Sequence, residues 1–194
     1  MIIALGILAL VAIYFVSTYN TFQRLKTQIE ASIQEIGNQL KRQASLIPNL
    51  QSAVKGYLKH EKDIFNKLTE ARKTAVQAEK SGNLEDMERA VQSMNSLVPR
   101  LQVVVEDNPE IKADQTVTKF MSELTDTADK LSYARRSLID LTQAYNQKLI
   151  TFPSNFVANL FGFKKQKGLV TPASGSHVEV SSAETKDVDV DLES

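Results

Sequence analysis

An N-terminal stretch without any charge constrains this chain more than any other feature. Residues 2–16 are apolar or aromatic apart from one glycine, and no charged side chain precedes Arg24. About 20 residues are needed to cross roughly 30 Å of hydrocarbon. A cleaved signal peptide would have basic residues before the stretch and a small-residue cleavage site after it, and neither is present. We therefore predict an uncleaved transmembrane anchor over residues 1–23, represented by Ile2, Leu5, Leu8, Val11, Phe15 and Val16.

The basic residues beside the anchor predict its orientation. Arg24, Lys26, Lys41 and Arg42 all follow the apolar stretch. Loops rich in lysine and arginine tend to stay in the cytoplasm. We therefore expect a single-pass protein with its N-terminus outside and the rest of the chain in the cytoplasm.

Composition excludes several kinds of site and favours long helices. The chain has 23 basic and 23 acidic side chains, no cysteine, no tryptophan and only seven glycines and five prolines. Without cysteine there is no disulfide, no thiolate nucleophile, no cysteine-bound zinc and no iron–sulfur cluster. Residues 170–194 hold six acidic side chains against Lys186 alone and few large apolar ones. We expect this tail to be disordered.

Apolar residues recur every three or four positions through residues 24–151, which is typical of amphipathic helices. The first stripe contains Phe22, Leu25, Ile29, Ile33, Ile36 and Leu40. Proline lacks a backbone donor and disfavours helix at the residue before it, so a turn is predicted near Pro48. A second stripe begins at Leu50 and should end near Gly82, after which Asn83 can cap the next helix.

Two further helical stripes follow. The third begins at Leu84 and should continue through residues 103–105 as a kinked helix despite Pro99. The fourth should start at the Asn108-Pro109 pair and end near Thr151, which makes it about 20 Å longer than the first at 1.5 Å per residue. We expect a bend, a raised start or a splay to absorb that excess. The predicted fold is all-α, an antiparallel four-helix bundle that returns residue 152 to the membrane.

Residues 152–169 combine aromatic and basic side chains. They include Phe152, Phe156, Phe161 and Phe163, followed by Lys164 and Lys165. This composition is typical of a segment that inserts apolar groups into a membrane surface and places bases against lipid headgroups. A short fifth helix packed over the end of the bundle is the alternative, and the sequence leaves both open.

No familiar catalytic set can be assembled from the remaining residues. His60-Glu61 matches the start of the zinc motif H-E-x-x-H, but position 64 is isoleucine, so a structural role is expected for His60. Glycine-rich phosphate loops and nucleophile elbows are absent from the sequence. We predict that the protein is not an enzyme and has no catalytic residue, cofactor or metal ion.

Several short motifs resemble the LemA family of bacterial membrane proteins in order and spacing. They contain Gln39, Lys41, Arg42, Pro48, Asn49, Lys55, Gly56, Tyr57, His60, Glu61, Arg72, Arg135, Tyr145 and Asn146, and they are followed by the phenylalanine-rich segment. The chain departs from the family pattern at Ile33, Gly37, Gln43, Ser45 and the Leu138-Ile139 pair. The resemblance implies an N-terminal transmembrane helix and an antiparallel helical bundle, and it implies no established activity.

We expect a non-enzymatic scaffold or adaptor in the bacterial cytoplasmic (inner) membrane. Its predicted partners are the lipid bilayer and either another protein or a second copy of the chain, with no nucleic acid. Family association points to a membrane metallopeptidase as one such protein. The alternative is a sensor that binds a ligand between the second and fourth helices through Tyr57, His60, Arg72, Arg135 and Tyr145.

Overall fold

The computed structural model describes residues 1–57 and 62–169, and these residues are helical without any strand. The helices are α1 (Ile2–Val54), α2 (Lys62–Ser81), α3 (Leu84–Asp107), α4 (Pro109–Ala113), α5 (Gln115–Ile150) and α6 (Ser154–Leu160). The motif residues His60 and Glu61 and the predicted disordered tail lie outside the described residues. The all-helical prediction is confirmed for the part of the chain that can be compared.

Helix α1 is a single rod of 53 residues that includes both the apolar N-terminal stretch and the first amphipathic stripe. Pro48 lies inside it, so the turn predicted at Pro48 is wrong, and the helix ends at Val54 instead. A proline inside a helix removes one hydrogen bond at a cost of about 3 kcal/mol. Ile47 and Leu50, on either side of Pro48, are almost completely buried, and their packing offsets that cost.

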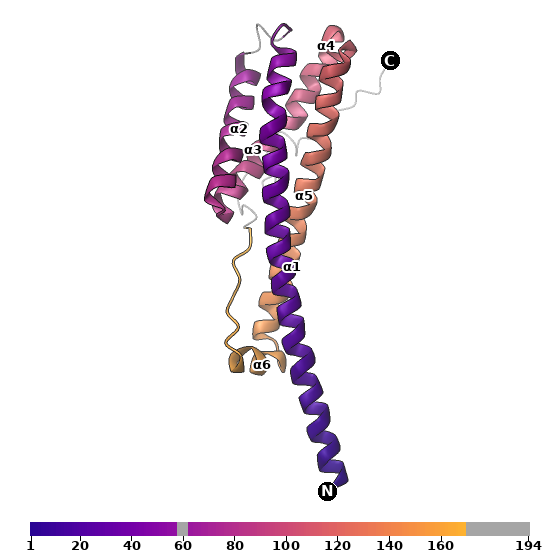
Figure 1. Ribbon diagram of the computed structural model, residues 1–194, viewed down its shortest axis with the longest axis vertical. Helices are drawn as coiled ribbons and strands as arrows, with labels where there is room; N and C mark the ends of the chain where they lie inside the picture. Colours follow the sequence, from indigo (N-terminus) through magenta and orange to yellow (C-terminus); the bar gives the residue numbers. More distant parts are fainter. Residues whose placement is uncertain (58–61, 170–194) are drawn as a thin grey trace, which may run out of the picture.

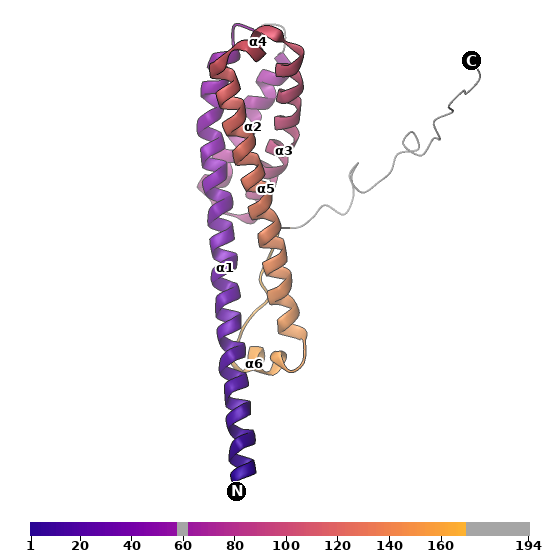
Figure 2. The same ribbon diagram turned by 90° about the vertical axis from the view of Figure 1, so that its right-hand side faces the viewer.

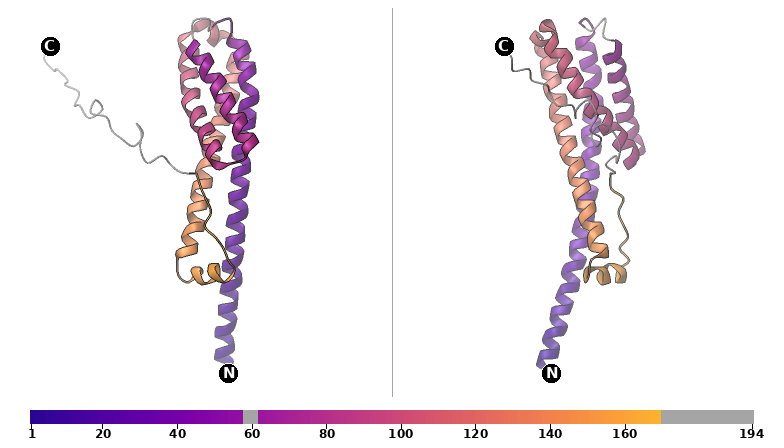
Figure 3. Two further views of the ribbon diagram at one scale, coloured as in Figure 1. Left: turned by 90° about the vertical axis from the view of Figure 1, so that its left-hand side faces the viewer. Right: turned by 180° about the vertical axis from the view of Figure 1, so that it is seen from behind.

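The long helices lie side by side and alternate in direction (Figure 1). Helix α1 packs against α5 and α2, α2 against α3, and α3 against α5. Helices α2 and α3 cover only the half of the α1–α5 pair that is remote from the N-terminus, while α6 lies at the other end (Figure 2). We call the end with α6 the basal end and the end with α4 the distal end. Beyond the basal end, α1 projects alone (Figure 3).

The part of α1 that follows the apolar stretch matches α5 in length, contrary to the expected excess. Residues 19–54 of α1 and the whole of α5 each contain 36 residues. Two local features produce the match: α1 continues past Pro48, and Asp114 separates the short helix α4 from α5. The Asp114 carboxylate caps α5 by accepting hydrogen bonds from the amides of Thr116 and Val117, at 2.8 and 3.3 Å.

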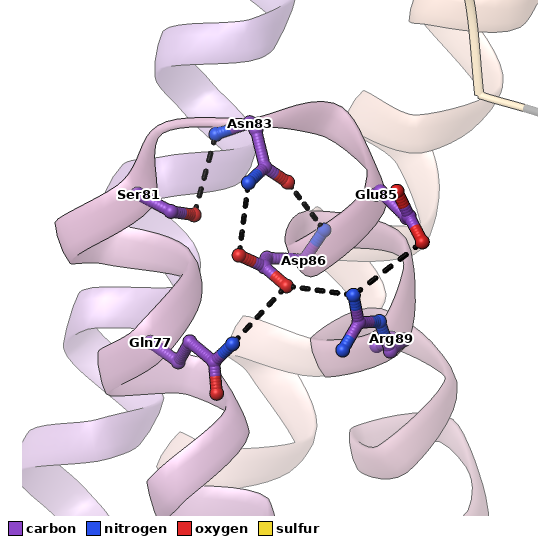
Figure 4. A network of polar contacts seen from close by, with 6 residues as sticks. All are labelled: Gln77, Ser81, Asn83, Glu85, Asp86 and Arg89. Atoms are coloured by element: carbon purple, nitrogen blue, oxygen red, sulfur yellow. Dashed lines mark hydrogen bonds and ion pairs between the residues drawn. The ribbon is translucent and has the colours of Figure 1, made fainter.

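The connection between α2 and α3 follows the predicted capping pattern. Gly82 has a φ of +61°, which favours glycine. The Asn83 side chain accepts a hydrogen bond from the Asp86 amide at 2.7 Å and donates one to the Asp86 carboxylate at 2.9 Å. The Asp86 carboxylate also accepts a hydrogen bond from the Gln77 side chain at 3.3 Å and forms an ion pair with Arg89 at 3.0 Å (Figure 4). Four polar groups thus hold the basal ends of α2 and α3 together.

The remaining helix boundaries match the predicted ones in part. Helix α3 continues through Pro99 and residues 103–105 to Asp107, as predicted. Pro109 occupies the first turn of α4, but the Asn108 amide donates to the Val104 carbonyl at 2.7 Å rather than capping α4. Thr151 ends α5 as expected.

We expect the α2–α3 connection to make stability depend on pH through Asp86. Hydrogen bonding of Ser81, then of Asn83, together with the charge of Arg89, lowers the pKa of Asp86 against the opposing effect of burial. A carboxylate with a lowered pKa stabilises the fold above its unfolded pKa of about 3.9, and that contribution is lost as the pH falls through the lower, folded value.

The Asp86→Asn variant should therefore have a lower melting temperature than the wild-type full-length protein at pH 7. This difference in melting temperature should become smaller below about pH 4. Circular dichroism in detergent micelles measures both. Glu85→Gln is the matched control, because Glu85 is exposed at the same helix start and makes only a 3.5 Å contact with Arg89. A difference that stays constant down to pH 2.5 would refute the role of Asp86.

Candidate functional site

An aromatic cluster joins the segments that meet at the basal end. Phe163 stacks on Phe22 with ring centroids 4.7 Å apart and planes at 22°, and Tyr145 meets the other side of Phe22 at 5.4 Å. Tyr19 lies 4.8 Å from Phe161 and 5.6 Å from Phe163. Such aromatic pairs stabilise by about 0.5–1.5 kcal/mol each beyond their burial. The cluster therefore fixes α6 and the residues after it to both α1 and α5.

Helix α6 has two apolar faces. Its inner face consists of Ser154, Val157 and Ala158, all buried, with the Ser154 hydroxyl donating to the carbonyls of Lys148 and Thr151 at 2.7 and 2.9 Å. Its outer face consists of Phe156 and Leu160, which are 61% and 68% exposed, and Phe152, two residues before the helix, is 73% exposed. A short helix with large apolar side chains on its outer face is unusual beside water and typical of a membrane interface.

A glycine turn after α6 determines which phenylalanines point outward. Gly162 has a φ of +68°, and the Phe163 amide donates to the Ala158 carbonyl at 2.9 Å, as in a Schellman motif. The turn directs Phe163 back onto Phe22. Phe163, which was predicted for the membrane-surface set, is therefore half-buried, whereas Phe152, Phe156 and Phe161 are exposed. Contact of these side chains with lipid stays a prediction.

An apolar groove runs between α6 and the part of α1 that precedes the aromatic cluster. Its volume is about 430 Å³. The lining side chains come from the transmembrane stretch and from the start of α6: Leu10, Val11, Tyr14, Phe15, Phe152, Pro153 and Phe156. The groove places α6 beside the predicted membrane span.

The basal end carries positive charge only. Residues 1–29 and 141–169 contain no acidic side chain. Their bases border the two uncharged segments, and we call five of them the basic collar: Arg24 and Lys26 after the span, Lys148 near the end of α5, and Lys164 and Lys165 after α6. All but Lys148, which is half-buried, are exposed.

Residues 162–169, the return segment, run from α6 back along the body toward the α2–α3 connection (Figure 1). The Asn146 side chain holds this segment by two hydrogen bonds of 2.9 Å, donating to the Gln166 carbonyl and accepting from the Gln166 amide. Gly168 is needed because a Cβ there would lie 2.9 Å from the Thr142 methyl group. Leu169, at the end of this segment, is buried.

Other motif residues stabilise contacts between helices or face solvent. Lys41 pairs with Glu79 at 3.2 Å, and Arg135 binds both carboxylate oxygens of Glu88, at 2.8 and 3.3 Å. Pro48 is half-buried, whereas Arg42, Asn49, Lys55, Gly56 and Arg72 are exposed. In the described ranges, no group of three or more histidine, aspartate or glutamate side chains could hold a metal ion.

The polar residues proposed for a ligand site do not converge. The Tyr57 hydroxyl contacts Asp114 at 3.3 Å, just before α5 begins, whereas Tyr145 lies 31 residues further along the same helix axis. At 1.5 Å per residue the separation is about 45 Å. Arg72 is exposed and Arg135 is bound to Glu88. These four residues therefore belong to different places, and His60 lies outside the described residues.

Two polar groupings escaped the sequence-based prediction. At the distal end, the charge of Asp114 raises the pKa of Tyr57, and the amides of Thr116 and Val117 lower the pKa of Asp114. In the core, Gln43 is fully buried, and among the described residues neither of its amide atoms has a hydrogen-bond partner. Gln39, one turn earlier, donates to Glu35 at 2.6 Å. Gln39 and Gln43 are four residues apart among the apolar residues of α1, and this spacing could have indicated that both lie on the buried face.

Comparisons with known proteins give one family and several relatives. Residues 32–181 match the model of the LemA family. Magnetosome protein MamQ of Magnetospirillum gryphiswaldense is 22% identical over 192 aligned residues, which cover 85% of this chain and 70% of that protein. Magnetosome proteins MamQ 1 and MamQ 2 of Paramagnetospirillum magneticum are each 24% identical over 191 residues, covering 84% of this chain and 70% of each relative.

The different environments of Phe163 and Phe156 predict a large loss of stability for one alanine variant and almost none for the other. Phe163→Ala should lower the free energy of unfolding by about 2 kcal/mol, less than for a fully buried phenylalanine, because Phe163 is half-buried against Phe22. Phe156→Ala should change it by less than about 0.5 kcal/mol, because that side chain is exposed. Chemical denaturation of the full-length protein in detergent compares the variants. Equal losses for both would mean that α6 packs in a different register.

Proposed function

Because the chain belongs to the LemA family, we propose that it is a single-pass membrane protein whose helices form an antiparallel four-helix bundle acting as a scaffold or adaptor. The bundle binds a protein partner or a second copy of the chain. The observation that carries this proposal is the continuity of α1, which joins the apolar stretch to the bundle without a break.

A continuous helix supports a scaffold because it transmits position. Residues 19–54 of α1 rise about 50 Å at 1.5 Å per residue, so the distal end stands well away from the membrane surface. Helix α5 runs beside α1 over this height and stiffens it. Aromatic side chains are enriched at protein interfaces. Two of them are exposed above the basal end: Tyr57 at the distal end and Tyr133 in the middle of α5.

The role of the polar motif residues supports a non-enzymatic function. Lys41, Arg135 and Asn146 bind Glu79, Glu88 and the backbone of Gln166 respectively. Each contact joins segments that are distant in the sequence. These side chains are thus used to hold the bundle together, which is what a rigid binding surface requires.

The charge asymmetry supports a cytoplasmic bundle in a bacterial inner membrane. The basal end has bases and no acids in residues 1–29 and 141–169, and lysine and arginine near a span favour the cytoplasmic side. The N-terminus is then outside. The relatives are named as magnetosome proteins. For this chain we propose the bacterial cytoplasmic (inner) membrane.

The chain contains no cysteine, so single cysteines can test the proposal in cells. Ser52→Cys and Ser132→Cys introduce thiols at exposed positions on α1 and α5. We expect both variants to remain in the membrane fraction after high salt and carbonate, because an apolar span holds them. A membrane-permeable thiol-to-amine crosslinker should give a discrete larger species in at least one variant.

Impermeant maleimide applied to intact spheroplasts provides the control for orientation and should not label either thiol until the cells are lysed. Release by carbonate would contradict the anchor. Retention in the membrane with only monomeric protein from both positions would contradict the scaffold while leaving the anchor intact.

A further inference from the structure

The apolar stretch of α1 is short for a membrane span. Residues 2–16 rise about 22 Å, against roughly 30 Å of hydrocarbon. Residues 17–23 are uncharged, and the Thr21 hydroxyl donates to the Ser17 carbonyl at 2.8 Å, which lowers the cost of burying it. The hydrocarbon region therefore extends along α1 to about the level of Tyr19.

Helix α6 lies at that level. Tyr19 contacts Phe161, and the groove brings Leu10 and Val11 beside Phe156. Helix α6 must then enter the bilayer on the bundle side when the span is embedded. Its exposed outer face is suited to acyl chains, and its polar backbone is satisfied within the helix and its glycine turn.

We propose that the groove between α1 and α6 is a binding site for an anionic phospholipid. One acyl chain lies in the groove between Leu10 and Val11 of α1 on one side and Phe152 and Phe156, at the α5–α6 turn and on α6, on the other. The phosphate reaches the basic collar above it. From Leu10 to Arg24 the helix rises about 21 Å, which leaves room for a chain below its headgroup. This proposal rests on the membrane anchor and not on the scaffold role.

Charge complementarity favours an anionic headgroup over a zwitterionic one. Residues 1–29 and 141–169 hold the basic collar without any acidic side chain. Lys167 is not part of the collar, because it lines a hollow with Glu85 and Glu88 near the α2–α3 connection. Each base near a membrane surface strengthens binding to anionic lipid about fivefold. Lys148 is positioned by α6 itself, because its carbonyl accepts the Ser154 hydroxyl at 2.7 Å. Free phosphate lacks the chain that fills the groove, so a phospholipid is the occupant we infer.

Native mass spectrometry of the full-length protein can test the site. The protein is purified in mild detergent and incubated with equal amounts of phosphatidylglycerol and phosphatidylcholine that carry the same acyl chains. We expect one retained phosphatidylglycerol per chain, in preference to phosphatidylcholine. Lys164→Gln/Lys165→Gln should reduce that preference about 30-fold, which corresponds to about 1 kcal/mol for each lysine. Phe152→Ala/Phe156→Ala should reduce retention of both lipids.

Matched controls separate the site from general charge and apolarity. Lys73→Gln/Lys119→Gln removes two exposed lysines outside the basal end, and Val103→Ala shortens an exposed apolar side chain of α3. Both should behave as wild type. Glycerol phosphate, which has a headgroup and no acyl chain, should not displace the lipid. Equal retention of the two lipids by wild type, or a loss in the controls equal to that in the site variants, would overturn the proposal even if the membrane anchor is confirmed.

Discussion

The structure depends on the continuity of α1 from the apolar stretch to the distal end. A helix that begins with exposed apolar side chains and continues into a buried stripe places the candidate membrane span and the packed helices on one axis. Every other element is arranged along that axis: α5 runs beside it, α2 and α3 cover its distal half, and α6 meets it at the basal end. Pro48 is compatible with this arrangement because tertiary packing outweighs the lost hydrogen bond.

The basal end combines three properties that favour the surface of a membrane. Aromatic stacking fixes α6, outward phenylalanines give it an apolar face, and the basic collar surrounds it without acids. None of these alone defines a site, since surface phenylalanines and lysines are common. They occur together because α5, equal in length to residues 19–54 of α1, returns the chain to the level of Tyr19.

Periodicity was sufficient to predict the helices and much of their order, because amphipathic stripes are a strong local signal. The cap at Asn83 and the glycine turn at Gly82 were predicted from residue type, because asparagine caps helix starts and glycine adopts the left-handed conformation at helix ends. The break at Asp114 and the continuation through Pro48 were not, since each depends on packing between segments distant in the sequence. Phe163 was assigned to the membrane surface because composition alone cannot show that the Gly162 turn directs one phenylalanine inward. The sequence could not show that Tyr57 and Tyr145 lie at opposite ends of α5. At 1.5 Å per residue they are about 45 Å apart, so they cannot form one site.

The central claim is that α6 enters the bilayer beside α1, and the depth of a single tryptophan tests it most directly. The natural chain has no tryptophan, so Phe156→Trp provides one reporter on the outer face of α6. The full-length variant is reconstituted into vesicles that contain lipids brominated at known positions along the acyl chain, with Tyr133→Trp as a reporter on α5. We predict that bromines on the acyl chains quench the tryptophan at position 156, and that aqueous acrylamide quenches only the one at position 133. Strong quenching of position 156 by acrylamide, with no effect of the bromines, would place α6 in water and contradict the account.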